Sequence, residues 1–466
     1  MNAGRVLMLA VPLMLCACEV GPNYRRPDAP VPAAYKELPA DAAQWNPSSP
    51  RDTEDRGPWW AIYADPELDS LERQVNISNQ NVKQYQAEYR EAVALLKEAE
   101  SLLYPTLTVN ADAQRGGVGG TTRTEFTLEA ALAWQPDIWG NIRRQVESRK
   151  AGVQVSEADL ANARLSSQAT LAADYFDLRA ADSLRSLLQQ AVSLDERLVE
   201  ITQNQVIAGT ASNGDLASAQ AQLEATQAQL AAVEQQRGTY EHAIAVLTGH
   251  LPSDLAIAPA PLTSTVPTVP VALPSTLLER NPSIAAAERQ MQQQSALIGV
   301  AIGAYFPTIS LSALGGYAGD PLSKLFNIGN RIWSVGAAAS DTVFQGGEQV
   351  AAVSNARATY DQYAAAYRQT VLGGFQQVED ELLALRVLQR AGEFQAQAVR
   401  SAQMAADVAL NEFNAGTVPY TTVITAVQAL VADQQSALTI QQNRLVASVT
   451  LIEALGGGWD VSQLSK

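Results

Sequence analysis

The sequence predicts a mainly α-helical fold with a small β part, built from two copies of one structural unit. Three observations predict it: long proline-free segments with helical periodicity, two pairs of segments in which apolar and polar residues alternate, and landmarks that recur 202 to 208 residues apart. Aromatic residues make up only 6% of the 466 residues, which suits closely packed long helices better than a β-rich enzyme core.

The charge balance and the scarcity of ligand residues exclude several function classes. The chain has 32 basic and 48 acidic residues, a formal charge of −16, so it is a poor candidate for nucleic-acid binding, which needs a basic face. Two histidines (His242 and His250) and two cysteines (Cys16 and Cys18) are too few for a His/Cys metal cluster. The chain also lacks a G-x-S-x-G motif. We expect no catalytic residue, no metal site, no cofactor and no enzyme activity.

Residues 1–17 have the pattern of an export signal. Arg5 precedes a short apolar run that is too short for a membrane-spanning helix. The run ends in Leu15-Cys16-Ala17-Cys18, which resembles a bacterial lipobox and makes Cys18 the first mature residue and the carrier of a covalent lipid. The alternative is a plain signal peptide with an incidental cysteine. Glu19, in place of an aspartate, favours sorting to the outer membrane by resemblance to lipoproteins.

Residues 18–65 are predicted to be a lipid-anchored extended segment. Nine prolines lie between residues 19 and 66, and proline at that density blocks helix interiors and central strands. The segment ends with Trp59-Trp60, followed by Asp65-Pro66, which predicts a helix start with an apolar staple. Helical periodicity then continues to Leu103, where Pro105 stops it.

The body of the chain is predicted to be a duplication. Tyr104-Pro105-Thr106-Leu107 recurs as Phe306-Pro307-Thr308-Ile309, and Ala208-Gly209-Thr210 recurs as Ala415-Gly416-Thr417. The alternative is that proline and glycine recur by chance. The predicted parts are a first repeat at 66–251, a proline-rich linker at 252–274, a second repeat at 275–458 and a tail at 459–466.

Each repeat contains one predicted strand pair, at about 106–135 and about 308–343. Apolar side chains alternate with Glu125, Thr127 and Glu129, so one face of the sheet is apolar. An apolar face ending in tryptophan is typical of a membrane β-barrel, and the soluble alternative is a sheet packed on a core. The candidate lipid-facing residues are Phe126, Leu128, Leu132, Trp134, Trp333 and Val335. Because open edges are not tolerated in lipid, four strands per chain predict an oligomer.

The remaining segments are predicted to be very long helices. Residues 141–208 contain no proline, and 68 residues span roughly 100 Å as a helix. From Leu216 to Leu247, apolar residues recur at steps of three and four, which predicts a heptad seam. A second stripe of small residues on the same segment allows close approach of another helix, namely Ala221, Ala225, Ala228 and Ala232. Helices with two such stripes can pack sideways into a closed cylinder. The alternative is an ordinary antiparallel coiled coil.

These motifs together resemble the outer membrane factor family, in its NodT/OprM-type lipoprotein branch related to TolC. They are the lipobox, Gly21-Pro22-Asn23-Tyr24-Arg25-Arg26-Pro27, Trp59-Trp60, Asp65-Pro66-x-Leu68 and the duplication. The resemblance implies a homotrimeric conduit, with a twelve-stranded β-barrel in the bacterial outer membrane on a long periplasmic α-barrel. It implies export of small molecules such as drugs and toxic compounds, without catalysis. The implied partners are outer-membrane lipid, a periplasmic adaptor and an inner-membrane pump of the resistance–nodulation–division type.

The resemblance also implies that two glycine-marked helix turns form a periplasmic tip that docks the adaptor. The matching positions are Val206, Ile207, Gly209, Thr210, Phe413, Asn414, Gly416 and Thr417. Both glycines also fit helix C-caps, which need a left-handed backbone.

The resemblance also implies an aperture beside the tip, which relatives often close with an acidic ring and a basic partner. This chain departs from that pattern, because both are absent at the matching positions. The candidate residues are Asp215, Glu412, Phe413, Tyr420, Thr421 and Thr425. A constriction of the two aromatic rings and threonine side chains is our hypothesis, and Asp215 equally fits an interaction with a helix N-terminus.

Other functions remain open beside small-molecule export. Outer membrane channels of protein secretion or metal efflux share the same scaffold. A periplasmic coiled-coil scaffold is a further alternative, although it needs no alternating strand pairs.

Overall fold

A computed structural model describes residues 19–28, 31–32, 34–37, 58–263, 265–267, 269, 274–459 and 463–464. The proposed signal peptide and Cys18 lie outside the described residues. The chain forms two compact units. The strand unit contains Tyr89–Ser156 and Ala287–Tyr367 with the N-terminal residues up to Asp28, and the helix unit contains the remainder.

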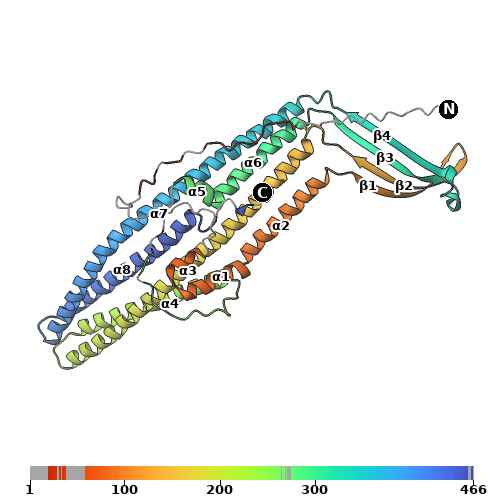
Figure 1. Ribbon diagram of the computed structural model, residues 1–466. Helices are drawn as coiled ribbons and strands as arrows, with labels where there is room; N and C mark the ends of the chain where they lie inside the picture. The colour runs from red at the N-terminus through yellow and green to blue at the C-terminus, as the bar shows by residue number, and fades with distance from the viewer. Residues whose placement is uncertain are drawn as a thin grey trace, which may run out of the picture. The chain divides into compact units, whose positions relative to one another are not determined.

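The observed elements confirm a mainly helical, duplicated fold (Figure 1). The first half contains η2 (Trp59–Tyr63), α1 (Pro66–Ser78), α2 (Gln80–Ser101), β1 (Thr106–Val118), β2 (Thr121–Trp134), α3 (Asn141–Ile207) and α4 (Asn213–Leu247). The second half contains α5 (Pro274–Arg280), α6 (Pro282–Gly303), β3 (Thr308–Gly319), η3 (Leu322–Lys324), η4 (Ile328–Asn330), β4 (Arg331–Ser340), α7 (Glu348–Asn414) and α8 (Tyr420–Ala454). Helices α3 and α7 both have 67 residues, and α4 and α8 both have 35.

No described helix is apolar over enough of its length to cross a bilayer.

The single helix expected from 68 to 103 is broken at Asn79, which lies between α1 and α2. Its side-chain oxygen accepts a hydrogen bond from the Val82 N–H at 3.0 Å, and its Nδ2 donates to the Leu247 carbonyl at 2.8 Å. Asn281 repeats this arrangement in the second half, with Nδ2 donating to the Ala454 carbonyl at 3.0 Å. The break at Asn79 therefore depends on the end of α4, and the break at Asn281 depends on the end of α8. Local periodicity does not reveal these distant partners.

The four strands form one antiparallel sheet in the order β1-β2-β3-β4, so β1 and β4 are its edges. The register places Leu107 opposite Leu132, Leu132 opposite Ala313, and Ala313 opposite Val335. Because strand side chains alternate between faces, every second residue from these positions shares one face across the sheet. The β1–β2 and β3–β4 connections lie at the end away from the helices of the strand unit (Figure 1).

The predicted seam of α4 is covered in the helix unit. Ala219, Thr226, Val233 and Ile244 are buried. Arg237 also lies on the seam, where its Nε donates to Asp182 on α3 at 2.6 Å and its Nη2 donates to the Ile257 carbonyl at 2.5 Å. Arg237 therefore joins the first part of the proline-rich linker to α3 and α4. Both charged groups are hydrogen-bonded, which offsets the cost of removing them from water.

The first described residues are held against the N-terminus of α3. Arg144, only 1% exposed, donates from Nε to the Val20 carbonyl at 3.1 Å and from Nη2 to the Asn23 side chain at 2.9 Å. Glu19 lies 3.7 Å from the same guanidinium, and the Val20 N–H donates to the Trp139 carbonyl. The segment that follows Cys18 is therefore docked on the strand unit.

Candidate functional site

The two glycine-marked turns, one between α3 and α4 and the other between α7 and α8, have the same backbone conformation. Gly209 has φ 78° and Gly416 has φ 75°, both in the left-handed region that favours glycine. The next residue in each turn donates its N–H to the carbonyl five residues earlier, at 2.8 Å from Thr210 and 3.0 Å from Thr417. The two hydroxyls donate to the same carbonyls at 3.1 and 2.9 Å. The turns are helix C-caps, as the glycines predict.

Most of the candidate tip residues are exposed on these turns. Ile207 is 78% exposed, which is unusual for a large apolar side chain. Val206 is half-buried and Phe413 is buried. The exposed set is Ile207, Gly209, Thr210, Asn414, Gly416 and Thr417.

A polar capping box closes the first turn. Ser212 is the N-cap of α4, and its hydroxyl accepts a hydrogen bond from the Asp215 N–H at 3.1 Å. The Asp215 carboxylate accepts in return from the Ser212 N–H at 3.0 Å and from the Ser212 hydroxyl at 2.8 Å. These bonds, first the backbone one and then the side-chain one, lower the pKa of Asp215. Asp215 therefore caps a helix N-terminus, which is the simpler of the two roles expected for it.

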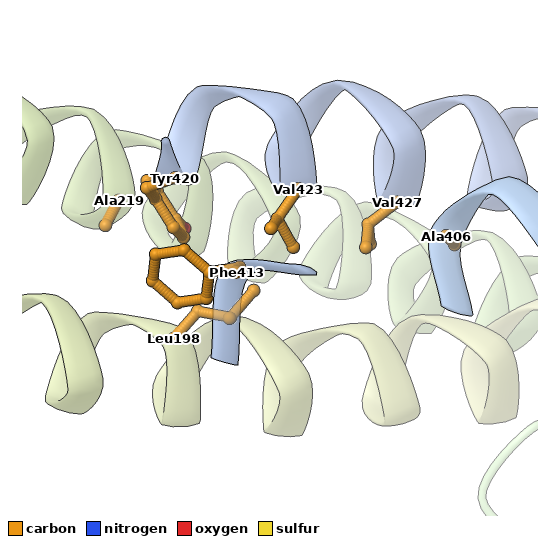
Figure 2. Close-up of a cluster of buried hydrophobic side chains, with 7 residues drawn as sticks. All are labelled: Leu198, Ala219, Ala406, Phe413, Tyr420, Val423 and Val427. Carbon is orange, nitrogen blue, oxygen red and sulfur yellow. The ribbon is translucent and has the colours of Figure 1, made fainter. Parts of the chain in front are cut away.

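An aromatic pair takes the corresponding place at the second turn. The rings of Phe413 and Tyr420 lie 5.8 Å apart and are only 4% and 3% exposed. They pack in a cluster contributed by α3, α4, α7 and α8 (Figure 2). Its members are Leu198, Ala219, Ala406, Phe413, Tyr420, Val423 and Val427.

This placement corrects the hypothesis of an aromatic constriction. The two rings pack between the helices of their own chain and are almost fully covered, so they present no surface that could line an aperture. The physical reason is the apolar area of the rings, whose burial is favourable by about 25 cal/mol per Å².

Polar groups that the sequence analysis missed lie in this cluster and beside it. The Tyr420 hydroxyl has no hydrogen-bond partner among the described residues. Burial, with the charge of Asp195 as a smaller cause, raises the pKa of Tyr420 to about 12. Asp195 accepts a hydrogen bond from the Thr226 hydroxyl at 2.7 Å, and burial raises the pKa of Asp195. Thr226 at an otherwise apolar seam position was the available signal for this buried carboxyl group.

The other aperture candidates lie on exposed helix faces. Thr421 and Thr425 are one turn apart on α8, and the Thr425 hydroxyl donates to the Thr421 carbonyl at 2.9 Å. Glu412 is exposed near the end of α7. These three side chains are exposed, whereas the two rings are buried.

The candidate lipid-facing residues share one face of the sheet, as their alternation predicts. Trp333 and Val335 on β4 are 76% and 77% exposed. Leu132 and Trp134 on β2 are exposed, and Phe126 and Leu128 are half-buried. The opposite face carries polar groups, including Asn110 on β1, whose Nδ2 donates to Glu129 at 3.4 Å.

Comparison with known proteins assigns the family. A family model described as outer membrane efflux protein matches residues 71–250 and 273–457. The solvent efflux pump outer membrane protein SrpC of Pseudomonas putida is 28% identical over 472 residues, covering 97% of each chain. The pyoverdine export outer membrane protein OpmQ of Pseudomonas aeruginosa is 27% identical over 473 residues, covering 98% of each.

Solved structures agree with the sequence matches. The outer-membrane channel OprN superposes with a TM-score of 0.87 at 28% identity, covering 95% of this chain and all of that one. The CmeC outer membrane channel of Campylobacter jejuni has a TM-score of 0.87 at 22% identity, with 96% of each chain covered, and shows the shared fold. From the matched segments and the TolC-like fold we conclude that the chain belongs to the outer membrane efflux protein family.

Proposed function

We propose that the protein is the passive, homotrimeric exit channel of a tripartite efflux pump, carrying small molecules such as drugs and toxic compounds through the outer membrane. One observation carries the proposal: a four-stranded sheet with an apolar, exposed face and two edge strands, β1 and β4. In hydrocarbon, each unpaired backbone group at such an edge costs several kcal/mol, so the edges need strands from other copies. Three copies supply twelve strands, a size within the range of outer-membrane barrels.

Disulfide trapping tests the shared barrel. Paired cysteines, one on β1 and one on β4, are expected to cross-link neighbouring copies and to give a three-chain product on denaturing gels. Pairs on β1 and β3 serve as the control, because β3 is an inner strand that already pairs with β2 and β4 of its own chain and offers no free edge to another copy. The trimer would be contradicted if the largest cross-linked product contained two chains, or if the control pairs gave the same yield of product.

The exposed turn residues support a docking role for the tip. An adaptor that ends in helical hairpins would meet Ile207, the exposed apolar side chain of the first turn. We expect Ile207→Asp to abolish efflux without changing trimer mass. Val246→Asp is the matched control, because Val246 is an exposed apolar residue (64%) at the far end of α4.

The docked N-terminal segment supports Cys18 as the lipid carrier. Glu19 and Val20 are held by Arg144 and Trp139 in the strand unit, so an acyl group on the preceding residue would start beside that unit. Mass spectrometry of the mature N-terminal peptide is expected to show an acylated Cys18. An unmodified peptide that starts elsewhere would contradict lipidation.

Single-channel conductance and export in cells test the conduit itself. The purified protein is expected to form discrete channels in planar bilayers. It should also restore export of a small toxic compound in cells that have the inner-membrane pump and adaptor but lack their own channel. Export of only a metal ion or a protein would support the alternative channel functions, and absence of conductance and of trimers would support a scaffold.

A further inference from the structure

The apolar face of the sheet ends in arginines at the side of the hairpin connections. Arg115 on β1 lies opposite Thr124, and Arg331 on β4 lies opposite Tyr317. Counting in steps of two from Leu107 and Val335 places both arginines on the apolar face, and both are exposed. Near the bilayer midplane an arginine on this face would cost about 2–4 kcal/mol, whereas near the interface the cost falls to about 0–1 kcal/mol.

The β3–β4 connection continues this face with a built, apolar surface. Leu325 is 4% exposed, and the Asn330 side chain donates to the Lys324 carbonyl at 2.8 Å, so the connection has its own internal packing. The Phe326 ring packs edge-on against Tyr317 with centroids 5.5 Å apart, which puts it beside the apolar face. Even so, three large side chains remain exposed, namely Leu322, Phe326 and Ile328.

Cations are placed beside these apolar side chains. Lys324 is exposed within the connection, and Arg331 begins β4 directly after it. The segment from Asp320 to Arg331 contains one acidic and two basic residues, although the whole chain has a formal charge of −16. Apolar side chains flanked by guanidinium and ammonium groups match a lipid surface whose headgroups carry phosphate.

We infer that this outward rim, defined by Arg115, Lys324, Arg331 and the apolar residues of the β3–β4 connection, binds the phosphorylated glycolipid (lipid A) of the outer leaflet. The two guanidinium groups and the ammonium group contact its phosphates, and Leu322, Phe326 and Ile328 enter its acyl region. Guanidinium groups bind phosphate oxygens in a bidentate manner, which favours the terminal phosphate groups of this glycolipid over a phospholipid phosphodiester, because the diester has fewer free oxygens and less charge. The inference rests on the proposed orientation, with the hairpin connections at the outer surface.

The sheet provides a matched control residue. Arg123 on β2 lies opposite Gly116 in the same hairpin end, but its register places it on the polar face with Glu125 and Thr127. It has the same charge as Arg115 and is next along β2 to Thr124, the residue opposite Arg115, but its side chain lies on the other face of the sheet.

Lipid titration of the full-length protein in detergent tests the inference. Native mass spectrometry would measure bound lipid A, its dephosphorylated form and phosphatidylglycerol. The wild-type protein is expected to bind the phosphorylated glycolipid about tenfold more tightly than the dephosphorylated form, because the dephosphorylated form cannot make the charged contacts. Arg115→Gln with Arg331→Gln should remove that preference, Arg115→Lys with Arg331→Lys should retain part of it, and Arg123→Gln should leave it unchanged.

Three outcomes would overturn the inference: equal binding of the phosphorylated and dephosphorylated forms, equal binding of phosphatidylglycerol, or the same loss in Arg123→Gln. Conductance of each variant is measured in parallel, because the substitutions lie on the lipid side and should leave the channel open. Normal channels without lipid preference would reject only the lipid site, whereas absence of channels from the wild-type protein would reject the proposed function. If the glutamine pair does not assemble, Lys324→Gln, in the connection outside the strands, is expected to lower the preference alone.

Discussion

The two turns of the helix unit have the same backbone conformation but are stabilised in different ways. Ser212 and Pro419 are equivalent, 207 residues apart, as are Val206 and Phe413. The first turn is closed by a polar capping box between residues three positions apart. The second has a proline N-cap without a side-chain hydrogen bond, and its aromatic pair packs against Leu198 of α3. The duplication therefore retained the turn geometry, while the interactions that stabilise it diverged from local and polar to tertiary and apolar.

This difference determines how each turn can move. The capping box moves with α4 as a unit, because both partners belong to the start of that helix. Phe413 and Tyr420 contact residues of α3 and α4, so a displacement of the second turn must take two rings out of their packing site. We expect the second turn to be the more strongly coupled to the arrangement of the four helices.

Removing the aromatic anchor should give the largest effect. Phe413→Ala is expected to destabilise the helix unit by about 3–5 kcal/mol, because it leaves a cavity in a buried cluster. The equivalent Val206→Ala removes less, and only half-buried, surface, so its cost should stay below about 2 kcal/mol. Thermal and denaturant unfolding followed by circular dichroism would measure both. Equal losses would show that the turns are stabilised alike.

Replacing the turn glycines should affect both turns by the same amount. Gly209→Ala and Gly416→Ala each force a side chain into the left-handed region, at about 1–2 kcal/mol. Hydrogen exchange of the amides in each turn, read by mass spectrometry, would report the local loss. A large difference between the two variants would show that the two turns do not have equivalent backbone conformations.

The capping box should make only the first turn sensitive to acid. Ser212→Ala is expected to cost about 1 kcal/mol. Because the pKa of Asp215 is lowered in the folded protein, its stabilisation is present above the ordinary carboxyl pKa and is lost as the pH falls through the lowered value. Protection of the first-turn amides, measured relative to their intrinsic exchange rate at each pH, should fall in that acidic range. The second turn, which has Thr422 at the position of Asp215, should show no such step, and Ser212→Ala should abolish it.

Removing the tyrosine hydroxyl should have the smallest effect. The Tyr420 hydroxyl is buried without a described partner, so Tyr420→Phe is expected to change stability by less than about 0.5 kcal/mol or to raise it. Tyr420→Ala is the comparison, since it removes the ring itself. The same unfolding measurements apply, and a marked loss in Tyr420→Phe would reveal a hydrogen bond to the hydroxyl, with Asp195 as the nearby acceptor.

Much of this fold was predictable from local signals. The alternation around Phe126 and Trp134 predicted the strands and their apolar face, and Gly209 and Gly416 predicted both helix ends. Proline-free length and heptad spacing predicted α3 and the covered seam of α4. These signals act within a few residues of one another, so they can be interpreted without knowing what lies next to the segment.

Contacts between distant segments decided the rest. Asn79 breaks a helix because the end of α4, 168 residues away, supplies its carbonyl partner. Arg237 occupies an apolar seam position because Asp182 of α3 neutralises it there. Phe413 and Tyr420 face inward because Leu198 and Ala219 cover them, although their position beside a turn is equally compatible with facing a passage. The sequence by itself determined the order, length and faces of the elements, and the tertiary structure decided which faces are covered, because burial depends on neighbours that lie far apart along the chain.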